Sequence, residues 1–307
     1  MSTVEVMVTA QVPQSVIAVL QRHFTVHHRE HIREASVLHR VRAVVGAQGV
    51  RISRDWLALL PQLELLCLTG PQTQGVDLAE TERRRIAVVP GPDVQGPERA
   101  DYVVATLLGL CRQWPEADRF VRNSDWVDGP FPPAHRFSGL RVGVVGFDGT
   151  AQALLPRLAA FGIGGACWVP SPQPGCPWPQ VHSLSELLDQ SVHVLVVLDE
   201  SLATAQGPIG AAHIARLLAP SYIVCLTHSG VLDDQTVPEA LKTRRLQGLA
   251  LDDYPEAPRV PAVWRQTPRT CVTPAIAAWT EEALADISQA LVRNICRHFG
   301  LTPQSAA

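Results

Sequence analysis

The chain alternates short apolar runs with segments in which apolar residues recur every three or four positions. The short runs predict β-strands, and the three-to-four spacing predicts amphipathic helices. Strands that alternate with helices favour a parallel sheet that is covered on both faces. The expected strands are residues 4–10, 41–46, 63–70, 86–90, 141–146, 164–169, 192–199, 222–227, 246–254 and 270–274.

Segments with the apolar spacing of helices lie between these strands and after the last of them. Residues 14–24 and 53–60 carry it between the first strands, and residues 98–123 predict a long apolar helix with a break near Pro115. Residues 280–299 predict an amphipathic helix, because acidic residues stand in its first turn and basic residues in its last. With 307 residues the chain is long enough for two domains.

The composition is that of a soluble globular protein, with 46% hydrophobic and 18% charged residues and a net charge of −3. Lys and Arg residues do not form the clusters that a nucleic-acid-binding surface requires, so we expect no nucleic-acid partner. No apolar run reaches the roughly 18 residues that span a membrane, and no signal peptide opens the chain, so we expect a cytoplasmic protein. Dispersed cysteines without a CxxC pair predict reduced thiols; they are Cys67, Cys111, Cys167, Cys176, Cys225, Cys271 and Cys296.

The stretch RVGVVGFDGTAQALLPRLAAFG, residues 141–162, has the rhythm of a dinucleotide-binding turn: a strand, a glycine and a helix from about Ala151. Gly146 fills the first glycine place, which makes the tight turn, and Ala151 fills the third. Asp148 stands at the second, where the backbone approaches phosphate. Two like charges about 4 Å apart repel by roughly 4 kcal/mol at an effective dielectric near 20. Gly149 is the residue that would let the turn remodel.

The end of the next strand lacks the residues that recognise the adenosine ribose. An acidic residue normally accepts from the ribose there, and this sequence has Pro170 at about that place. No arginine follows to hold a 2′-phosphate, so NADP is not favoured either. We therefore expect a dinucleotide to bind weakly if at all, with weak NAD binding and no cofactor as equal alternatives.

Five segments, in order, resemble the D-2-hydroxyacid dehydrogenase family, which includes phosphoglycerate, formate and D-lactate dehydrogenases. The resemblance implies two doubly wound α/β domains with parallel sheets, of Rossmann and flavodoxin-like type. It implies a Rossmann domain of residues 99–280 inserted in a substrate domain of residues 1–98 plus 281–307, and a homodimer. The segments are residues 115–126, 139–162, 183–197, 237–258 and 272–283.

The resemblance also locates the family's catalytic positions, and this sequence departs from each. The acid–base histidine of the Thr-Pro-His segment is Ala275, which cannot transfer a proton. The glutamate that orients that histidine is Ala257, with Glu256 beside it. The arginine that grips the substrate carboxylate falls on His228 or Ser229, depending on the direction of counting, and neither offers a bidentate fork.

Two further family positions are altered or ambiguous. Asp252 stands where the family meets the nicotinamide carboxamide, although a turn-capping role is equally consistent with an aspartate there. The substrate-carboxylate loop is TGPQTQGVD, residues 69–77, in which Pro71 removes a backbone donor. The candidate polar residues of this loop are Gly70, Gln72, Thr73 and Gln74.

Other polar clusters carry weaker alternatives. His23, His27, His28 and His31 would favour a metal if His27 and His31 shared a helical face, but a short strand entering a polar loop fits the stretch better, so we expect no metal site. His228 next to Ser229 suggests a nucleophile and its base, although adjacent residues rarely meet productively.

These observations predict a family member that has lost 2-hydroxyacid oxidation and serves as a ligand- or partner-binding homodimer. A small molecule or a protein partner would occupy the cleft between the domains, with no nucleic acid or membrane involved. One alternative is an enzyme of non-redox chemistry in that cleft, using His228, Glu256 or Asp252. Another is an NAD(P)-dependent oxidoreductase that acts on a 2-hydroxy or 2-oxo acid through a non-standard active site.

Overall fold

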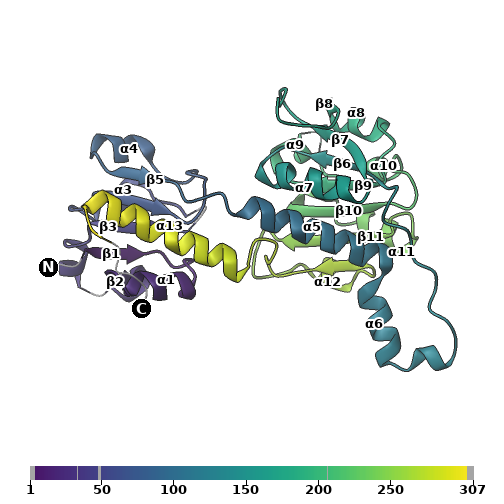
Figure 1. Ribbon diagram of the computed structural model, residues 1–307, viewed down its shortest axis with the longest axis horizontal. Helices are drawn as coiled ribbons and strands as arrows, with labels where there is room; N and C mark the ends of the chain where they lie inside the picture. Colours follow the sequence, from purple (N-terminus) through teal and green to yellow (C-terminus); the bar gives the residue numbers. More distant parts are fainter. Residues whose placement is uncertain (1–3, 33, 48–49, 206, 303–307) are drawn as a thin grey trace. The chain divides into compact units, whose positions relative to one another are not determined.

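The computed structural model describes residues 4–32, 34–47, 50–205 and 207–302. The chain separates into two compact units. Unit 1 comprises Met1–Val94 and Thr280–Ala307, and unit 2 comprises Gln95–Trp279. In the described residues both units are α/β with all-parallel sheets, which confirms the expected fold class (Figure 1).

The described residues of unit 1 form a five-stranded sheet in the order β2-β1-β3-β4-β5. This order is that of a flavodoxin-like doubly wound fold. The strands are β1 (Glu5–Val8), β2 (Thr25–His28), β3 (Ala43–Gly46), β4 (Leu65–Leu68) and β5 (Ala87–Val89). The helices are α1 (Gln14–Gln21), η1 (Arg29–His31), α2 (Ala35–Leu38), α3 (Arg54–Ala58), α4 (Leu78–Arg83) and α13 (Glu281–Phe299).

The sheet of unit 1 is buried on both faces. Along β1, Val6 and Val8 pack into one core cluster with α1 and α13, while Met7 packs into the other with Leu57 of α3. Continuous burial explains why β3 and β4 are apolar throughout rather than alternating, whereas the edge strand β2 is partly exposed and carries His27 and His28. Helix α13 lies along this sheet (Figure 1); the side chain of Thr280 caps it at its first residues, and Gly300 ends it.

The described residues of unit 2 form a seven-stranded sheet in the order β12-β11-β10-β9-β6-β7-β8. Its strands are β6 (Arg141–Val145), β7 (Gly164–Trp168), β8 (Gln180–Val181), β9 (Val194–Val197), β10 (Tyr222–His228), β11 (Gly248–Asp253) and β12 (Thr270–Val272). Its helices are α5 (Gln95–Arg112), α6 (Trp114–Arg122), η2 (Asp125–Val127), α7 (Gly149–Ala160), α8 (Leu184–Asp189), α9 (Glu200–Thr204), α10 (Ala211–Ile214), η3 (Ser229–Val231), α11 (Thr236–Lys242) and α12 (Ala262–Gln266).

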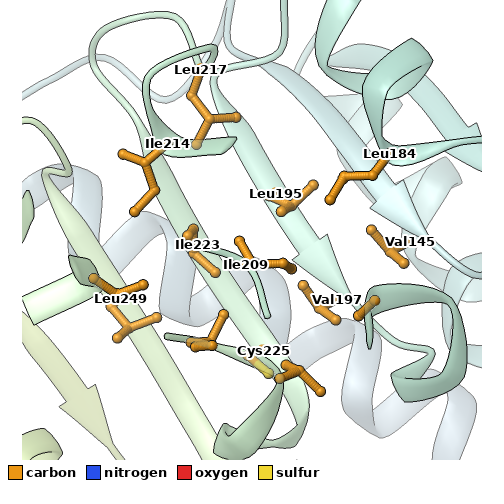
Figure 2. Packing of buried hydrophobic residues seen from close by; sticks show 14 of the residues in the cluster. Val145, Leu184, Leu195, Val197, Ile209, Ile214, Leu217, Ile223, Cys225 and Leu249 are labelled. Carbon is orange, nitrogen blue, oxygen red and sulfur yellow. The ribbon is translucent and has the colours of Figure 1, made fainter. Parts of the chain in front are cut away.

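The two faces of this sheet also carry separate cores. One core covers β6, β9, β10 and β11 with apolar side chains, among them Leu195, Ile223 and Leu249 (Figure 2). The opposite face packs against α5 and α7, and Gly96 of α5 lets the two helices approach. A Cβ on Gly96 would lie 2.7 Å from the backbone of Gly149.

The long segment 98–123 is interrupted near Pro115, as expected, and forms two helices. Helix α5 begins at Gln95, three residues before the expected start, and α6 begins at Trp114. The break lies at Gln113, whose φ of +53° is left-handed, and Pro115 follows within the first turn of α6. In Figure 1, α6 and the segment after it extend away from the sheet of unit 2. Within the described ranges, no helix combines the length and hydrophobicity needed to span a membrane.

Candidate functional site

The carboxyl edge of the unit 2 sheet is the place where the fold can build a site. The strand order reverses between β6 and β9, and open α/β sheets bind ligands at such a reversal. Gly146 follows β6 with a φ of +100°, and a Cβ there would lie 2.9 Å from the Cβ of Asp199 after β9. Glycine is therefore required where these two loops meet.

Asp148 is the N-cap of α7. Its Oδ1 accepts from the backbone N–H of Ala151 at 3.0 Å, and Oδ2 accepts from Thr150 Oγ1 at 3.3 Å. The N-terminus of a helix after such a turn is where dinucleotide-binding folds hold a pyrophosphate. Here the chain's own carboxylate takes one of these amides. Gly149 is the first helical residue and has no positive φ, so it does not remodel the turn.

Arg99, which the sequence interpretation missed, is the cation nearest this cap in the described contacts. Its Nη1 lies 3.9 Å from Asp148 Oδ2, and its Nη2 donates to the carbonyl of Leu226 at 2.9 Å. The Arg99 side chain is 21% exposed, compared with 46% for Asp148. Arg99 thus joins α5 to the ends of β10 and α7, and nothing in its local sequence marks this role.

His228, at the end of β10, forms a pair with Glu200, the first residue of α9. His228 Nε2 lies 2.6 Å from Glu200 Oε1, and Nδ1 accepts from the N–H of Gly230 at 3.1 Å. The proton of the neutral ring therefore sits on Nε2. Sequence reasoning missed Glu200, although an acidic residue directly after a strand was a usable signal. Both ring nitrogens are engaged within the chain.

The other candidates around His228 do not join it. Ser229 is 2% exposed, and the contacts of the His228 ring are with Glu200 and Gly230, so the suggested nucleophile–base pair is not formed. Glu256 and Ala257 are exposed on the loop after β11. Glu256 is one residue away from the family's glutamate position, Ala257, and its side chain lies at the surface.

Asp252 is buried and its carboxylate is fully engaged. Oδ1 accepts from Thr273 Oγ1 at 2.6 Å and from the N–H of Ile276 at 2.9 Å, and Oδ2 accepts from the N–H of Ala277 at 2.8 Å. The N–H of Ala275 donates to the Asp252 carbonyl at 2.8 Å. Asp252 therefore holds the 273–277 turn, which includes Ala275 at a φ of +55°.

Two tyrosines enclose this turn. The hydroxyl of Tyr102 lies 2.6 Å from Thr273 Oγ1, and burial, together with the charge of Asp252, raises the Tyr102 pKa. The hydroxyl of Tyr254 donates to the carbonyls of Leu251 and Thr273. Burial raises its pKa to about 12. Both phenols stay protonated at neutral pH and act as fixed donors.

The loop proposed for a substrate carboxylate lies in unit 1. Gly70 is buried, and its carbonyl accepts from the N–H of Gly91 at 2.9 Å. Thr73 turns the chain toward Gly75, which has a φ of +97°. Asp77 caps α4 by accepting from the N–H of Glu80 at 3.0 Å. The side chains of Gln72 and Gln74 are exposed at the tip.

The histidine stretch of unit 1 contains a short strand, as expected, and η1 follows that strand. His27 and His28 lie in β2, His27 pairs with Glu5, and the rings of His28 and His31 stand 5.2 Å apart. They line a cavity of about 380 Å³ together with Glu34. No group of His, Cys, Asp and Glu side chains among the described residues is arranged to hold a metal ion.

Comparisons with known proteins agree with this architecture. The family described as D-isomer specific 2-hydroxyacid dehydrogenase, NAD binding domain, matches residues 104–277. A glyoxylate/hydroxypyruvate reductase A of Arabidopsis thaliana is 26% identical over 267 residues, which are 86% of this chain and 85% of that protein. A 2-ketogluconate reductase of Gluconobacter oxydans is 25% identical over 289 residues, 91% of this chain and 90% of that protein.

Solved structures resemble the chain over nearly its whole length. The 2-hydroxyacid dehydrogenase from Ketogulonicigenium vulgare has a TM-score of 0.88 at 27% identity and covers 99% of this chain and 97% of its own. An NADPH-dependent glyoxylate/hydroxypyruvate reductase from Sinorhizobium meliloti has a TM-score of 0.81 at 23% identity, with 98% of both chains covered, and shares the fold. The chain therefore belongs to the D-isomer specific 2-hydroxyacid dehydrogenase family.

Proposed function

We propose that this chain is a member of the family that no longer oxidises 2-hydroxy acids and instead binds a ligand or a protein partner. The observation that carries the proposal is the set of residues at the three positions matching the family's catalytic residues. Ala275 has no ionisable group, and Ala257 cannot orient one. His228 has no guanidinium group to bind a carboxylate with two hydrogen bonds, and its ring is paired with Glu200. Hydride transfer to a 2-oxo acid needs a proton donor, which Ala275 and Ala257 do not provide.

Weak or absent NAD binding is the second part of the proposal. A nucleotide diphosphate at α7 has to displace the Asp148 cap or accept its negative charge at close range. Losing an N-cap costs about 0.5–2 kcal/mol, and about 1.4 kcal/mol corresponds to a tenfold loss of affinity. Arg99 offsets part of the charge but stands 3.9 Å away. NADP is disfavoured further, since Pro170 and its neighbours offer no 2′-phosphate clamp.

We also propose a homodimer formed through unit 2. Large apolar side chains are exposed on α6 and η2, where Trp126 is 66% and Val127 is 87% exposed. Trp114 and Val121 are 57% and 55% exposed on α6. A cluster of exposed large apolar side chains in one projecting segment favours an interface, and a second copy is the partner that the family resemblance implies.

The His228–Glu200 contact favours a second candidate, a non-redox enzyme. A histidine that donates to a carboxylate is a common acid–base arrangement, and this pair sits at the carboxyl edge of the sheet. To act on a ligand, His228 has to release either Gly230 or Glu200. Glu200 is 53% exposed and is the easier partner to displace. Glu256 is exposed and free to approach a ligand, whereas Asp252 is committed to the 273–277 turn.

The third alternative, an NAD(P)-dependent oxidoreductase with a non-standard active site, requires a proton donor from another residue. The experiment that separates the three mixes the full-length protein with NADH or NADPH and a panel of 2-oxo acids that includes glyoxylate, hydroxypyruvate and 2-ketogluconate. We expect no consumption of reduced nucleotide above the protein-free rate. Consumption that grows with protein concentration would contradict the proposal and establish the third alternative.

Nucleotide binding is measured separately from turnover. The seven tryptophans allow energy transfer to bound reduced nucleotide to be followed during a titration. We expect no saturation below millimolar nucleotide. Binding in the micromolar range without turnover would refute the cofactor part of the proposal and leave the catalytic part standing.

A further inference from the structure

Two cysteines of unit 2 that lie nine positions apart in the sequence meet in space. Cys167 is in β7, and Cys176 is in the segment PSPQPGCPWP, residues 170–179, that leads to β8. We propose that Cys167 and Cys176 are an oxidation site, at which a peroxide converts the two thiols into an intrachain disulfide. This inference does not rest on the proposed function.

The backbone brings the segment back onto β7. The N–H of Cys167 donates to the carbonyl of Pro179 at 2.9 Å, and Cys167 pairs with Gln180 in the register of β7 and β8. Both cysteines contribute to the same core cluster, Cys167 fully buried and Cys176 partly exposed at its border. Burial and the neighbouring Cys176 thiol raise the Cys167 pKa, and Cys176 Sγ donates to the carbonyl of Trp178 at 3.5 Å.

The segment that carries Cys176 is held in place by its own contacts. Gln180 Oε1 accepts from the N–H of Gln173 at 2.7 Å, and Gln180 Nε2 donates to the Gln173 carbonyl at 2.9 Å. The N–H of Cys176 donates to the Gln173 carbonyl at 3.0 Å. The prolines of the segment restrict its backbone further. The segment that carries Cys176 is therefore fixed beside β7 before oxidation, so closing the bond orders little additional chain.

The reaction balances with one peroxide. Cys176, the more exposed of the two, attacks the peroxide oxygen and becomes a sulfenic acid while one water leaves. The Cys167 sulfur then attacks the Cys176 sulfur, the S–S bond forms, and the hydroxyl of the sulfenic acid leaves with the Cys167 proton as a second water. The two sulfurs together lose two electrons, and the peroxide takes both.

Cys271 provides a matched control. It is the other partly exposed cysteine among the described residues and packs against the same core cluster. Burial raises its pKa, and so do the charges of Glu116 and Asp252. Cys67, Cys111, Cys225 and Cys296 are buried. Cys271 therefore resembles Cys176 in exposure and in its core cluster, but it is not the cysteine beside Cys167.

The test treats the full-length protein with stoichiometric hydrogen peroxide and measures its intact mass without reductant. We expect a loss of about 2 Da that dithiothreitol reverses, and a cross-linked peptide pair containing Cys167 and Cys176. The Cys271→Ser variant should keep the mass loss, and Cys176→Ser should lose it. Cys176→Ala repeats the test without a hydroxyl, and the circular dichroism spectra of both Cys176 variants verify that they fold.

Three results would overturn the proposal. One is oxygen added at Cys176 without a cross-link, and another is a cross-link that survives in both Cys176 variants. The third is an unchanged mass while an alkylating reagent still labels Cys176. Hydrogen exchange gives a second readout, because the disulfide should slow exchange of amides in residues 170–179 of the wild type and not of Cys176→Ser.

Discussion

The Asp148 carboxylate accepts the backbone N–H of Ala151 at 3.0 Å, at the helix terminus where a dinucleotide-binding fold would place its pyrophosphate. The chain thus supplies its own anion to α7. The sequence indicated only the charge of Asp148, whereas the contact shows that Asp148 can oppose a phosphate in two ways. The negative charge repels phosphate, and the capping bond occupies an amide that phosphate would use.

Two substitutions at Asp148 separate these effects. Asp148→Asn keeps a capping oxygen and removes the charge, whereas Asp148→Gly removes both at little loss of helix stability. We expect Asp148→Gly to raise NADH affinity about tenfold or more, corresponding to about 1.4 kcal/mol. If charge dominates, Asp148→Asn recovers most of that gain; if occupation of the amide dominates, it recovers little.

The control for this pair is another helix cap. Ser183 caps α8 by accepting from the N–H of Glu186 at 3.1 Å. Ser183→Gly loses a cap of the same kind away from α7 and should leave NADH affinity unchanged. An Asp148→Gly variant that binds no better than the wild type would contradict the electrostatic account and point to the adenosine side as the main defect.

The buried Asp252 should be essential for stability. Asp252→Asn replaces one of the two acceptor oxygens by an NH₂ group, which cannot accept a hydrogen bond. Depending on the orientation of the amide, the substitution loses either the bond from the N–H of Ala277 or the bonds at Oδ1. A hydrogen bond to a charged group contributes about 1.5–3 kcal/mol, so we expect the free energy of unfolding in urea to fall by about 2 kcal/mol or more. Asp253→Asn, at an exposed neighbour, should change it by less than about 0.5 kcal/mol. Equal effects would refute the role given to Asp252.

Glu5 should make unit 1 sensitive to acid. Burial raises the Glu5 pKa, but hydrogen bonds and charges from His27 and Arg40 outweigh it and bring the pKa below 4.5. Because the folded-state pKa is lowered, the stabilisation is present above the unfolded value and is lost as pH falls through the folded one. Glu5→Gln should therefore flatten the decline of unfolding free energy below about pH 4.5. Glu64→Gln, which breaks the exposed pair with Arg42, serves as the control; an identical acid response in the two variants would contradict this assignment.

The proposed dimer is tested at Trp126. We expect wild-type protein to sediment as a dimer and Trp126→Glu to sediment as a monomer, because a charge replaces one of the most exposed large apolar side chains of η2. Leu218→Glu changes a side chain that is 41% exposed outside this segment and should leave the dimer intact. A monomeric wild type, or a dimer that persists in Trp126→Glu, would exclude this interface.

The sequence was sufficient for the fold because its signals are local or repetitive. Apolar runs located most of the strands, although not the two-residue β8 (Gln180–Val181), and the charge pattern of residues 280–299 located α13. The five family segments predicted the order of the α/β elements. The start of α5 at Gln95 was missed because residues 95–97, Gln-Gly-Pro, are poor helix signals, and Gly96 is explained only by its packing against Gly149.

The site was less predictable because its contacts join residues far apart in the sequence. Asp148 was identified as an anion in the glycine loop, but its bond to Ala151 depends on where α7 begins. Arg99 is 127 residues from Leu226, and Glu200 is 28 residues from His228, so neither pair leaves a spacing signal. The turn-capping role of Asp252, one of two equal alternatives from sequence, is the one that the observed hydrogen bonds match.

A single-turnover experiment tests the loss of 2-hydroxyacid oxidation most directly. NADH and glyoxylate are mixed with an excess of the full-length protein over NADH, and the absorbance of the reduced nicotinamide is followed. We expect the absorbance to stay at the protein-free level, because Ala275 and Ala257 leave no proton donor at those positions. A decay of the absorbance in step with formation of glycolate would contradict it.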